Sequence, residues 1–129
     1  MNRLGCGRPG YGDAGRGGAT AASASARGAD VAEPCCGDGA LVRHLEAFGL
    51  RCVYAGDIAT GQDALALDTY GDADAVISNP PYTRELMHRL IAHFQRIAPT
   101  WLLIDYDWSA TKQAARYLPH CSDIVILPA

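Results

Sequence analysis

The sequence has no run of about 18 consecutive apolar residues, the length that a membrane-spanning helix requires. Its N-terminus, MNRLGCGRPG, is rich in glycine where a secretory signal peptide would have an apolar core. Both absences argue against a membrane partner and against secretion. We therefore expect a cytoplasmic protein.

The sequence also lacks a metal-binding or disulfide pattern. Its five cysteines are an odd number and contain no CxxC pair, which fits neither a disulfide framework nor a zinc ribbon. The histidines, His44, His88, His93 and His120, do not have the spacing of metal ligands. We expect no metal site, and cysteines that remain reduced.

Basic residues are scarce outside the N-terminal segment. Residues 1–29 contain four arginines and one aspartate, so the other 7 basic and 13 acidic residues give the rest of the chain a formal charge of −6. No cluster of lysine or arginine is visible in that acidic part. Proteins that bind nucleic acid through its phosphates normally present a basic face, and the sequence shows little that would form such a binding surface.

The length of 129 residues corresponds to one domain, with room for one sheet and a few helices. Residues 1–29 hold eight of the 14 glycines and few large apolar side chains, so burial cannot offset the entropy lost on ordering them. We predict a disordered leader over residues 1–29 and a folded domain over residues 30–129. The alternative is that the leader is an extension not native to the fold.

Short apolar runs alternate with stretches of helical period from residue 30 onward. The runs predict strands at residues 30–36, 51–57, 73–78, 101–105 and 123–127. The periodic stretches predict helices at residues 40–48, 84–97 and 110–118, and the ambiguous segment 60–72 is interpreted as holding a short edge strand at 64–67. This alternation predicts an α/β fold with a mostly parallel sheet, in which ligands bind at the carboxyl ends of strands.

The segment EPCCGDGAL, residues 33–41, joins the first predicted strand to the first predicted helix. Gly37 and Gly39 allow the backbone to approach a ligand closely, and the helix that follows offers unpaired N–H groups. An ordinary βα turn would have the same spacing. A dinucleotide site would need a third glycine where Val42 stands, so the segment disfavours NAD.

Asp57 ends the second predicted strand, 18 residues after Gly39. A carboxylate at this point of a nucleoside-binding sheet accepts hydrogen bonds from a ribose diol. The alternative role for such a residue is that of a helix or turn cap.

The most specific signal is Asn79-Pro80-Pro81-Tyr82, directly after the third predicted strand. Consecutive prolines fix the backbone, so the Asn79 side chain and the Pro80 carbonyl are held as acceptors for the two hydrogens of one amino group. Such acceptors would stabilise the positive charge that develops when the amine attacks an electrophilic methyl group. Tyr82 offers a face on which a planar amide or a flipped base stacks. A proline-rich turn that caps the next helix is the alternative.

These three segments together resemble the S-adenosylmethionine-dependent amino-methyltransferases, in particular the adenine-specific DNA methyltransferases. The resemblance rests on EPCCGDGAL, GDI and NPPY in that order, and it covers residues 30 to about 128. It implies a Rossmann-like methyltransferase sheet. Members of that family end in an antiparallel hairpin whose last strand inserts beside the others. Because the chain stops just after the strand predicted at 123–127, we expect a sheet that is incomplete at the C-terminal hairpin.

The resemblance also implies a set of site residues. The expected catalytic residues, which would bind the target amine and base, are Asn79, Pro80, Pro81 and Tyr82. The expected residues of the cofactor site are Glu33, Pro34, Gly37, Asp38, Gly39, Asp57 and Asp63. Asp57 would hold the ribose hydroxyls, and Asp63 would lie near the adenine of the cofactor, with Asp68 as a rival for that role.

We therefore expect transfer of a methyl group from S-adenosylmethionine to the N6 amino group of adenine in DNA. The same type of site would also suit an RNA base or the side-chain amide of a glutamine in a protein. A non-catalytic, truncated cofactor-binding domain is a further hypothesis, which the acidic body and the absent hairpin favour. The sequence does not indicate an oligomeric state.

Overall fold

The computed structural model describes residues 3–7 and 29–128. Among these residues, one sheet contains the strands β1 (Arg3–Gly7), β2 (Asp30–Glu33), β3 (Arg51–Ala55), β4 (Ala75–Ser78), β5 (Thr100–Asp105) and β6 (Asp123–Leu127). The α-helices are α2 (Ala40–Ala47) and α3 (Arg84–Ile97). The 3₁₀ turns are Ile58–Thr60, Ala64–Ala66, Tyr106–Ala110, Ala114–Arg116 and Leu118–His120.

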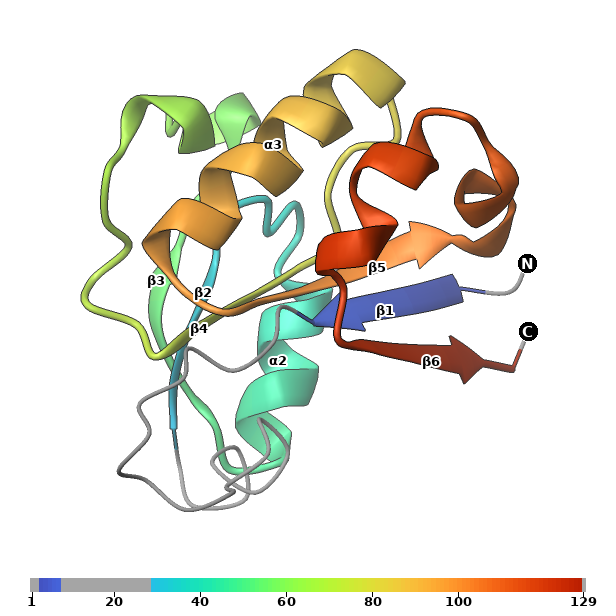
Figure 1. Ribbon diagram of the computed structural model, residues 1–129. Helices are drawn as coiled ribbons and strands as arrows, with labels where there is room; N and C mark the ends of the chain where they lie inside the picture. The colour runs from blue at the N-terminus through green and yellow to red at the C-terminus, as the bar shows by residue number, and fades with distance from the viewer. Residues whose placement is uncertain (1–2, 8–28, 129) are drawn as a thin grey trace, which may run out of the picture.

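The strands follow the order β3-β2-β4-β5-β1-β6 across the sheet (Figure 1). The strands β3, β2, β4 and β5 pair in parallel, so their carboxyl ends share one edge of the sheet. The strand β1 pairs antiparallel with β5 on one side and with β6 on the other. The fold is therefore an α/β arrangement with a mostly parallel sheet, as the sequence predicted.

The helix α3 covers one face of the sheet (Figure 1). Its apolar side chains recur at helical spacing, and Met87, Leu90 and Phe94 are buried in one core with apolar residues of β4 and β5. The helix has the predicted bounds, Arg84–Ile97. Pro99, two residues later, prevents its continuation because proline lacks the N–H that a further turn would need.

The helix α2 lies on the other face of the sheet (Figure 1) and is packed less tightly. Leu41 and Leu45 are half-buried, and no side chain of the helix is fully buried. The sequence placed Phe48 on the same apolar face, but Phe48 follows the helix as its C-cap and is 82% exposed. The helix therefore ends one residue earlier than predicted, and its apolar face is narrower.

The edge strand predicted at residues 64–67 is instead the 3₁₀ turn Ala64–Ala66. The Asp63 side chain precedes this turn and accepts a hydrogen bond from the Leu65 N–H at 3.0 Å. Such a cap stabilises a turn rather than an extended strand. The prediction of a strand was wrong because the capping aspartate outweighs the short apolar run.

The helix predicted at residues 110–118 is replaced by two 3₁₀ turns, Ala114–Arg116 and Leu118–His120. The Thr111 hydroxyl donates a hydrogen bond to the Trp108 carbonyl at 2.7 Å. Because this local bond competes with helical hydrogen bonding, it favours turns over a continuous helix. The prediction of a helix was therefore wrong.

The N-terminal segment contributes a strand to the sheet. The sequence predicted a disordered leader over residues 1–29, but Arg3–Gly7 forms β1 between β5 and β6, so the prediction was wrong for these five residues. Backbone hydrogen bonds to a strand on each side order this segment. The prediction considered only side-chain burial and so missed them. Residues 1–2 and 8–28 of the predicted leader lie outside the described residues.

Residues 3–7 and 29–128 include no helix that is long and apolar enough to cross a membrane. In the same part of the chain, no group of three or more histidine, cysteine, aspartate or glutamate side chains is placed to hold a metal ion. Cys35, Cys36 and Cys52 are free thiols. Cys121 takes part in a disulfide, so the expectation of reduced cysteines was wrong at that position.

Candidate functional site

A cleft of about 700 Å³ opens where β2, β3 and β4 reach their carboxyl ends. Ten of the eleven residues predicted for a site line it, namely Glu33, Pro34, Gly37, Asp38, Asp57, Asp63, Asn79, Pro80, Pro81 and Tyr82. Gly39 is not part of the lining and stands before α2 as its N-cap. The fold therefore brings three separate segments of the sequence to one cavity.

Glu33 ends β2 and is completely buried beneath the cleft. Its Oε1 accepts hydrogen bonds from the Cys35 N–H at 2.8 Å and from the Ser78 hydroxyl, and its Oε2 accepts one from the Asn79 N–H at 3.0 Å. Burial raises the pKa of the Glu33 carboxyl above its usual value, and these hydrogen bonds oppose the rise. Glu33 thus ties the turn after β2 to the loop after β4 and positions both.

The turn after Glu33 presents backbone to the cleft. Gly37 and Gly39 have φ angles of +52° and +83°, in the left-handed region that glycine adopts without strain. A Cβ atom on Gly37 would meet no other atom within 4 Å, so this part of the turn faces open space. The Asp38 carboxylate accepts a hydrogen bond from the Ala40 N–H at 3.0 Å and so helps to begin α2.

Asp57 lies two residues past the end of β3 and is half-buried. Its Oδ2 accepts a hydrogen bond from the Gly37 N–H at 2.9 Å. Its Oδ1 accepts one from the Ala59 N–H at 2.9 Å and caps the turn Ile58–Thr60. Asp57 therefore has the role of a cap, and the second lone pair of each oxygen leaves capacity for further donors such as hydroxyls.

The cysteines of the turn are poor nucleophiles. Burial raises the pKa of the Cys35 thiol to about 12. Burial also raises the pKa of Cys36, and the nearby Asp57 carboxylate adds to the rise. Because the thiolate is the reactive form of cysteine, these two side chains contribute shape to the cleft rather than covalent chemistry.

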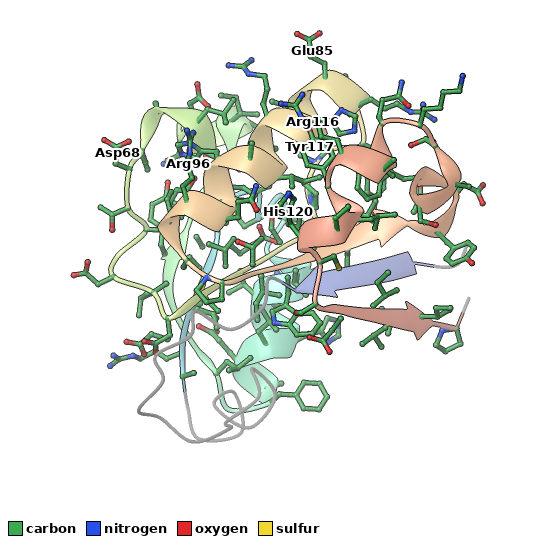
Figure 2. All side chains as sticks on the ribbon, in the orientation of Figure 1. Asp68, Glu85, Arg96, Arg116, Tyr117 and His120 are labelled. Atoms are coloured by element: carbon green, nitrogen blue, oxygen red, sulfur yellow. The ribbon has the colours of Figure 1, made fainter. Side chains whose placement is uncertain are left out.

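Asp63 lines the cleft, and its rival Asp68 does not. Figure 2 shows Asp68 at the outer edge of the molecule, away from the sheet. Asp63 is exposed, and its Oδ1 accepts the Leu65 N–H hydrogen bond that caps the following turn. Of the two aspartates, the geometry favours Asp63 as a residue that contacts a ligand.

The loop 79–82 holds an amide acceptor in a fixed orientation. Pro80 is buried and Asn79 is half-buried. The Tyr82 hydroxyl donates a hydrogen bond to Asn79 Oδ1 at 2.9 Å, and the Tyr82 side chain is 39% exposed. A carbonyl oxygen accepts two hydrogen bonds, so Asn79 Oδ1 has capacity for one more donor.

The cleft also contains side chains that were not predicted from the sequence. Ile58, Gln62, Leu86, Arg89 and Leu90 are part of its lining. Leu86, Arg89 and Leu90 share one face of α3, because residues three and four apart lie together on a helix. The apolar residues at this spacing were interpreted as core, which hid the arginine between them.

The cleft combines a backbone turn open to a ligand, a carboxylate suited to hydroxyl donors, and an amide acceptor beside an aromatic ring. Comparison with known proteins found no family model, no curated protein and no solved structure that matches this chain. The residues of the cleft are therefore the basis on which a function can be inferred.

Proposed function

We propose that this protein transfers a methyl group from S-adenosylmethionine to an exocyclic amino group, namely N6 of adenine in DNA. The main observation in support of the proposal is that Asn79 and Tyr82 line the same cleft as Gly37 and Asp57. Methyl transfer needs the acceptor amine and the nucleoside cofactor within one cavity. The mostly parallel sheet, with the cleft at its carboxyl edge, supports a Rossmann-like methyltransferase fold.

The residues present fit S-adenosylmethionine. A cavity of about 700 Å³ is within the range of small-molecule sites. Gly37 leaves space for a ligand beside the backbone, and the remaining lone pairs of Asp57 suit the two hydroxyls of a ribose. Ile58 is 70% exposed and offers an apolar surface for a purine, while Asp63 would accept a hydrogen bond from the amino group of that purine.

When bound, S-adenosylmethionine supplies an electrophilic methyl group on a sulfonium sulfur. Asn79 Oδ1 and the Pro80 carbonyl accept the two hydrogens of the target amine, and their partial negative charges stabilise the positive charge that develops on its nitrogen. The Tyr82 hydroxyl, 2.9 Å from Asn79 Oδ1, orients the amide, and the Tyr82 ring stacks on the flipped base. No general base is needed at first, because the proton of the amine becomes acidic only after methylation.

A second candidate is a domain that binds the cofactor without transferring the methyl group. The observation in its favour is that the Tyr82 hydroxyl already donates to Asn79 Oδ1. Backbone N–H groups also donate to both carboxylate oxygens of Asp57. These donors of the protein compete with the amine and with the ribose for the same acceptors.

Calorimetric titration of the purified chain with S-adenosylmethionine tests the cofactor half of the proposal. We expect saturable binding that Asp57→Ala weakens by about tenfold or more, since each hydrogen bond to a charged group contributes about 1.5–3 kcal/mol. Asp57→Asn keeps an oxygen that can cap the turn, so it separates lost binding from lost folding. A folded chain that binds no cofactor would contradict both candidates.

The acceptor is tested by incubating the chain with S-adenosylmethionine and DNA, RNA or protein. We expect nucleoside mass spectrometry to find N6-methyladenine in the DNA. A modified RNA base or a methylated glutamine would keep the chemistry and replace the acceptor. Cofactor binding without transfer to any of the three would support the second candidate.

A further inference from the structure

Three aromatic side chains form a cluster where α3 meets the turns after β5. His88 of α3 stacks on Tyr117, with ring centroids 5.0 Å apart and an interplanar angle of 30°. The Trp108 Nε1–H donates a hydrogen bond to His88 Nε2 at 3.0 Å, and the Trp108 and Tyr117 centroids are 6.1 Å apart. Trp108 is buried, whereas His88 and Tyr117 are half-buried. The cluster is thus anchored in the core and partly accessible to solvent.

Two arginines flank this cluster. Arg84 precedes His88 by four residues on α3, so both side chains lie on one face of the helix. The guanidinium carbon of Arg116 lies 5.9 Å from the centroid of the Tyr117 ring, and Figure 2 shows both side chains beside α3. Both arginines are exposed, and neither forms an ion pair with any residue in the described part of the chain. Glu85 projects from the start of α3 on its outer side (Figure 2).

The pKa of His88 is lowered, in agreement with its half-buried position near both arginines. Burial lowers the pKa, and the charges of Arg84 and Arg116 lower it further. His88 Nε2 accepts the Trp108 hydrogen bond, so that nitrogen carries no proton and the imidazole is neutral. The positive charge of this surface is therefore that of the two arginines.

Arg84 is close in sequence to the proposed acceptor site. Arg84 begins α3 two residues after Tyr82, and Arg89 of the same helix lines the cleft. Trp108 follows β5 at the same edge of the sheet, where the parallel strands have their carboxyl ends. The sequence showed no basic cluster, because Arg84 and Arg116 come together only through the contact of α3 with the last turns.

We propose that Arg84 and Arg116 bind the phosphate backbone of a nucleic-acid strand whose target base enters the cleft at Asn79. The inference rests on the proposed function, because that function places the base beside this surface. Charge complementarity favours a polyanion, since two exposed arginines that form no ion pair among the described residues lie on an otherwise acidic body. The partly accessible rings of His88 and Tyr117 add a surface on which a flanking base stacks.

Fluorescence anisotropy with a labelled, adenine-containing single-stranded oligonucleotide tests this surface. The test variant is Arg84→Gln/Arg116→Gln. The matched control is Arg43→Gln/Arg96→Gln, which removes the same charge from exposed positions on α2 and at the end of α3 that form no ion pair in the described part of the chain. A third variant, Arg84→Lys/Arg116→Lys, keeps the charge.

We expect the test variant to weaken binding on the order of tenfold and to reduce the slope of log affinity against log salt by about 1.4, which is about 0.7 for each phosphate contact on a single strand. The control and the lysine variant should keep the slope of the unmodified chain. Equal losses in the test variant and the control would overturn the inference. Binding of an acidic peptide through the same arginines, with no binding of the oligonucleotide, would also overturn it.

The two proposals fail in different ways. Oligonucleotide binding that depends on Arg84 and Arg116, in a chain that transfers no methyl group, would support the phosphate surface and contradict the proposed function. Methyl transfer to DNA that is unchanged in the test variant would support the function and overturn the surface. Calorimetric binding of S-adenosylmethionine to the test variant, expected to be unchanged, shows that the cleft remains intact.

Discussion

The backbone N–H of Asn79 donates a 3.0 Å hydrogen bond to the buried carboxylate of Glu33, which lies 46 positions earlier in the chain. Glu33 ends β2, and Asn79 directly follows the neighbouring parallel strand β4. The bond couples the glycine turn after β2 to the loop that carries the amide acceptor. The two halves of the cleft therefore keep a fixed relation to each other.

We predict that Glu33→Ala lowers the free energy of unfolding by about 3 kcal/mol or more. The substitution leaves three hydrogen-bond donors without their acceptor at a buried position, and each such loss costs about 1–3 kcal/mol. Urea denaturation followed by circular dichroism measures the change. Glu46→Ala, on the exposed side of α2, is the control and should change stability by less than about 0.5 kcal/mol. A loss at Glu33 as small as that of the control would contradict the coupling.

We predict that Asn79→Ala lowers kcat for methyl transfer by about 100-fold or more, as the loss of one preorganised group does in other electrostatic sites. Tyr82→Phe keeps the ring and removes the donor to Asn79 Oδ1, so its effect on kcat should be smaller. Binding of S-adenosylmethionine should be unchanged in both variants. Calorimetry measures cofactor binding, and a methylation assay measures transfer. An equal loss of both would argue against a role of Asn79 in transfer alone.

The stability of the chain should depend on pH through His88. Its pKa is lowered from 6.5, so the folded chain favours the neutral ring more than the unfolded chain does. The contribution to stability is complete above pH 6.5 and is lost as the pH falls through the lowered pKa of the folded state. The melting temperature should therefore fall more for the unmodified chain than for His88→Gln between pH about 7 and about 5. Parallel curves for the two proteins would show that His88 is not the titrating group.

We predict that Gly37→Ala weakens binding of S-adenosylmethionine, while Gly49→Ala does not. Both glycines have a positive φ and open space around the added Cβ, so each substitution should cost about 1–2 kcal/mol of stability through backbone strain. Gly37 lines the cleft, and Gly49 follows α2 away from it. Calorimetry on both folded variants compares the two effects. Equal affinities would mean that the turn does not contact the cofactor.

The strands β2 to β6 and the helix α3 could be predicted from the sequence, because apolar runs bounded by turn residues leave few alternatives. The strand β1 could not. Arg3–Gly7 has little apolar content, and it is ordered by backbone hydrogen bonds to strands that are remote in sequence. Local composition carries no information on such pairing.

The residues of the cleft also differ in whether the sequence could predict them. Gly37, Asp57 and Asn79 could be predicted, because each has a distinctive residue type in the turn or loop that follows a strand. Arg89 could not, since it lies on a helix face whose neighbours are apolar. The sequence also did not predict the buried hydrogen bonds by which Glu33 links the two loops, because a glutamate is as typical of a ligand contact as of a structural role.

The place of β1 in the sheet has a consequence for biosynthesis. Arg3 lies opposite Asp105 on one side and opposite Leu127 on the other, so β1 pairs with two strands that are made about 100 residues later. Until residue 127 has been made, β1 keeps an unpaired edge that is open to association with other chains. Pairing across so much of the chain also slows folding. The sheet therefore closes only after β6 has been made, and a chain that lacks β6 exposes the edge of β1 to aggregation.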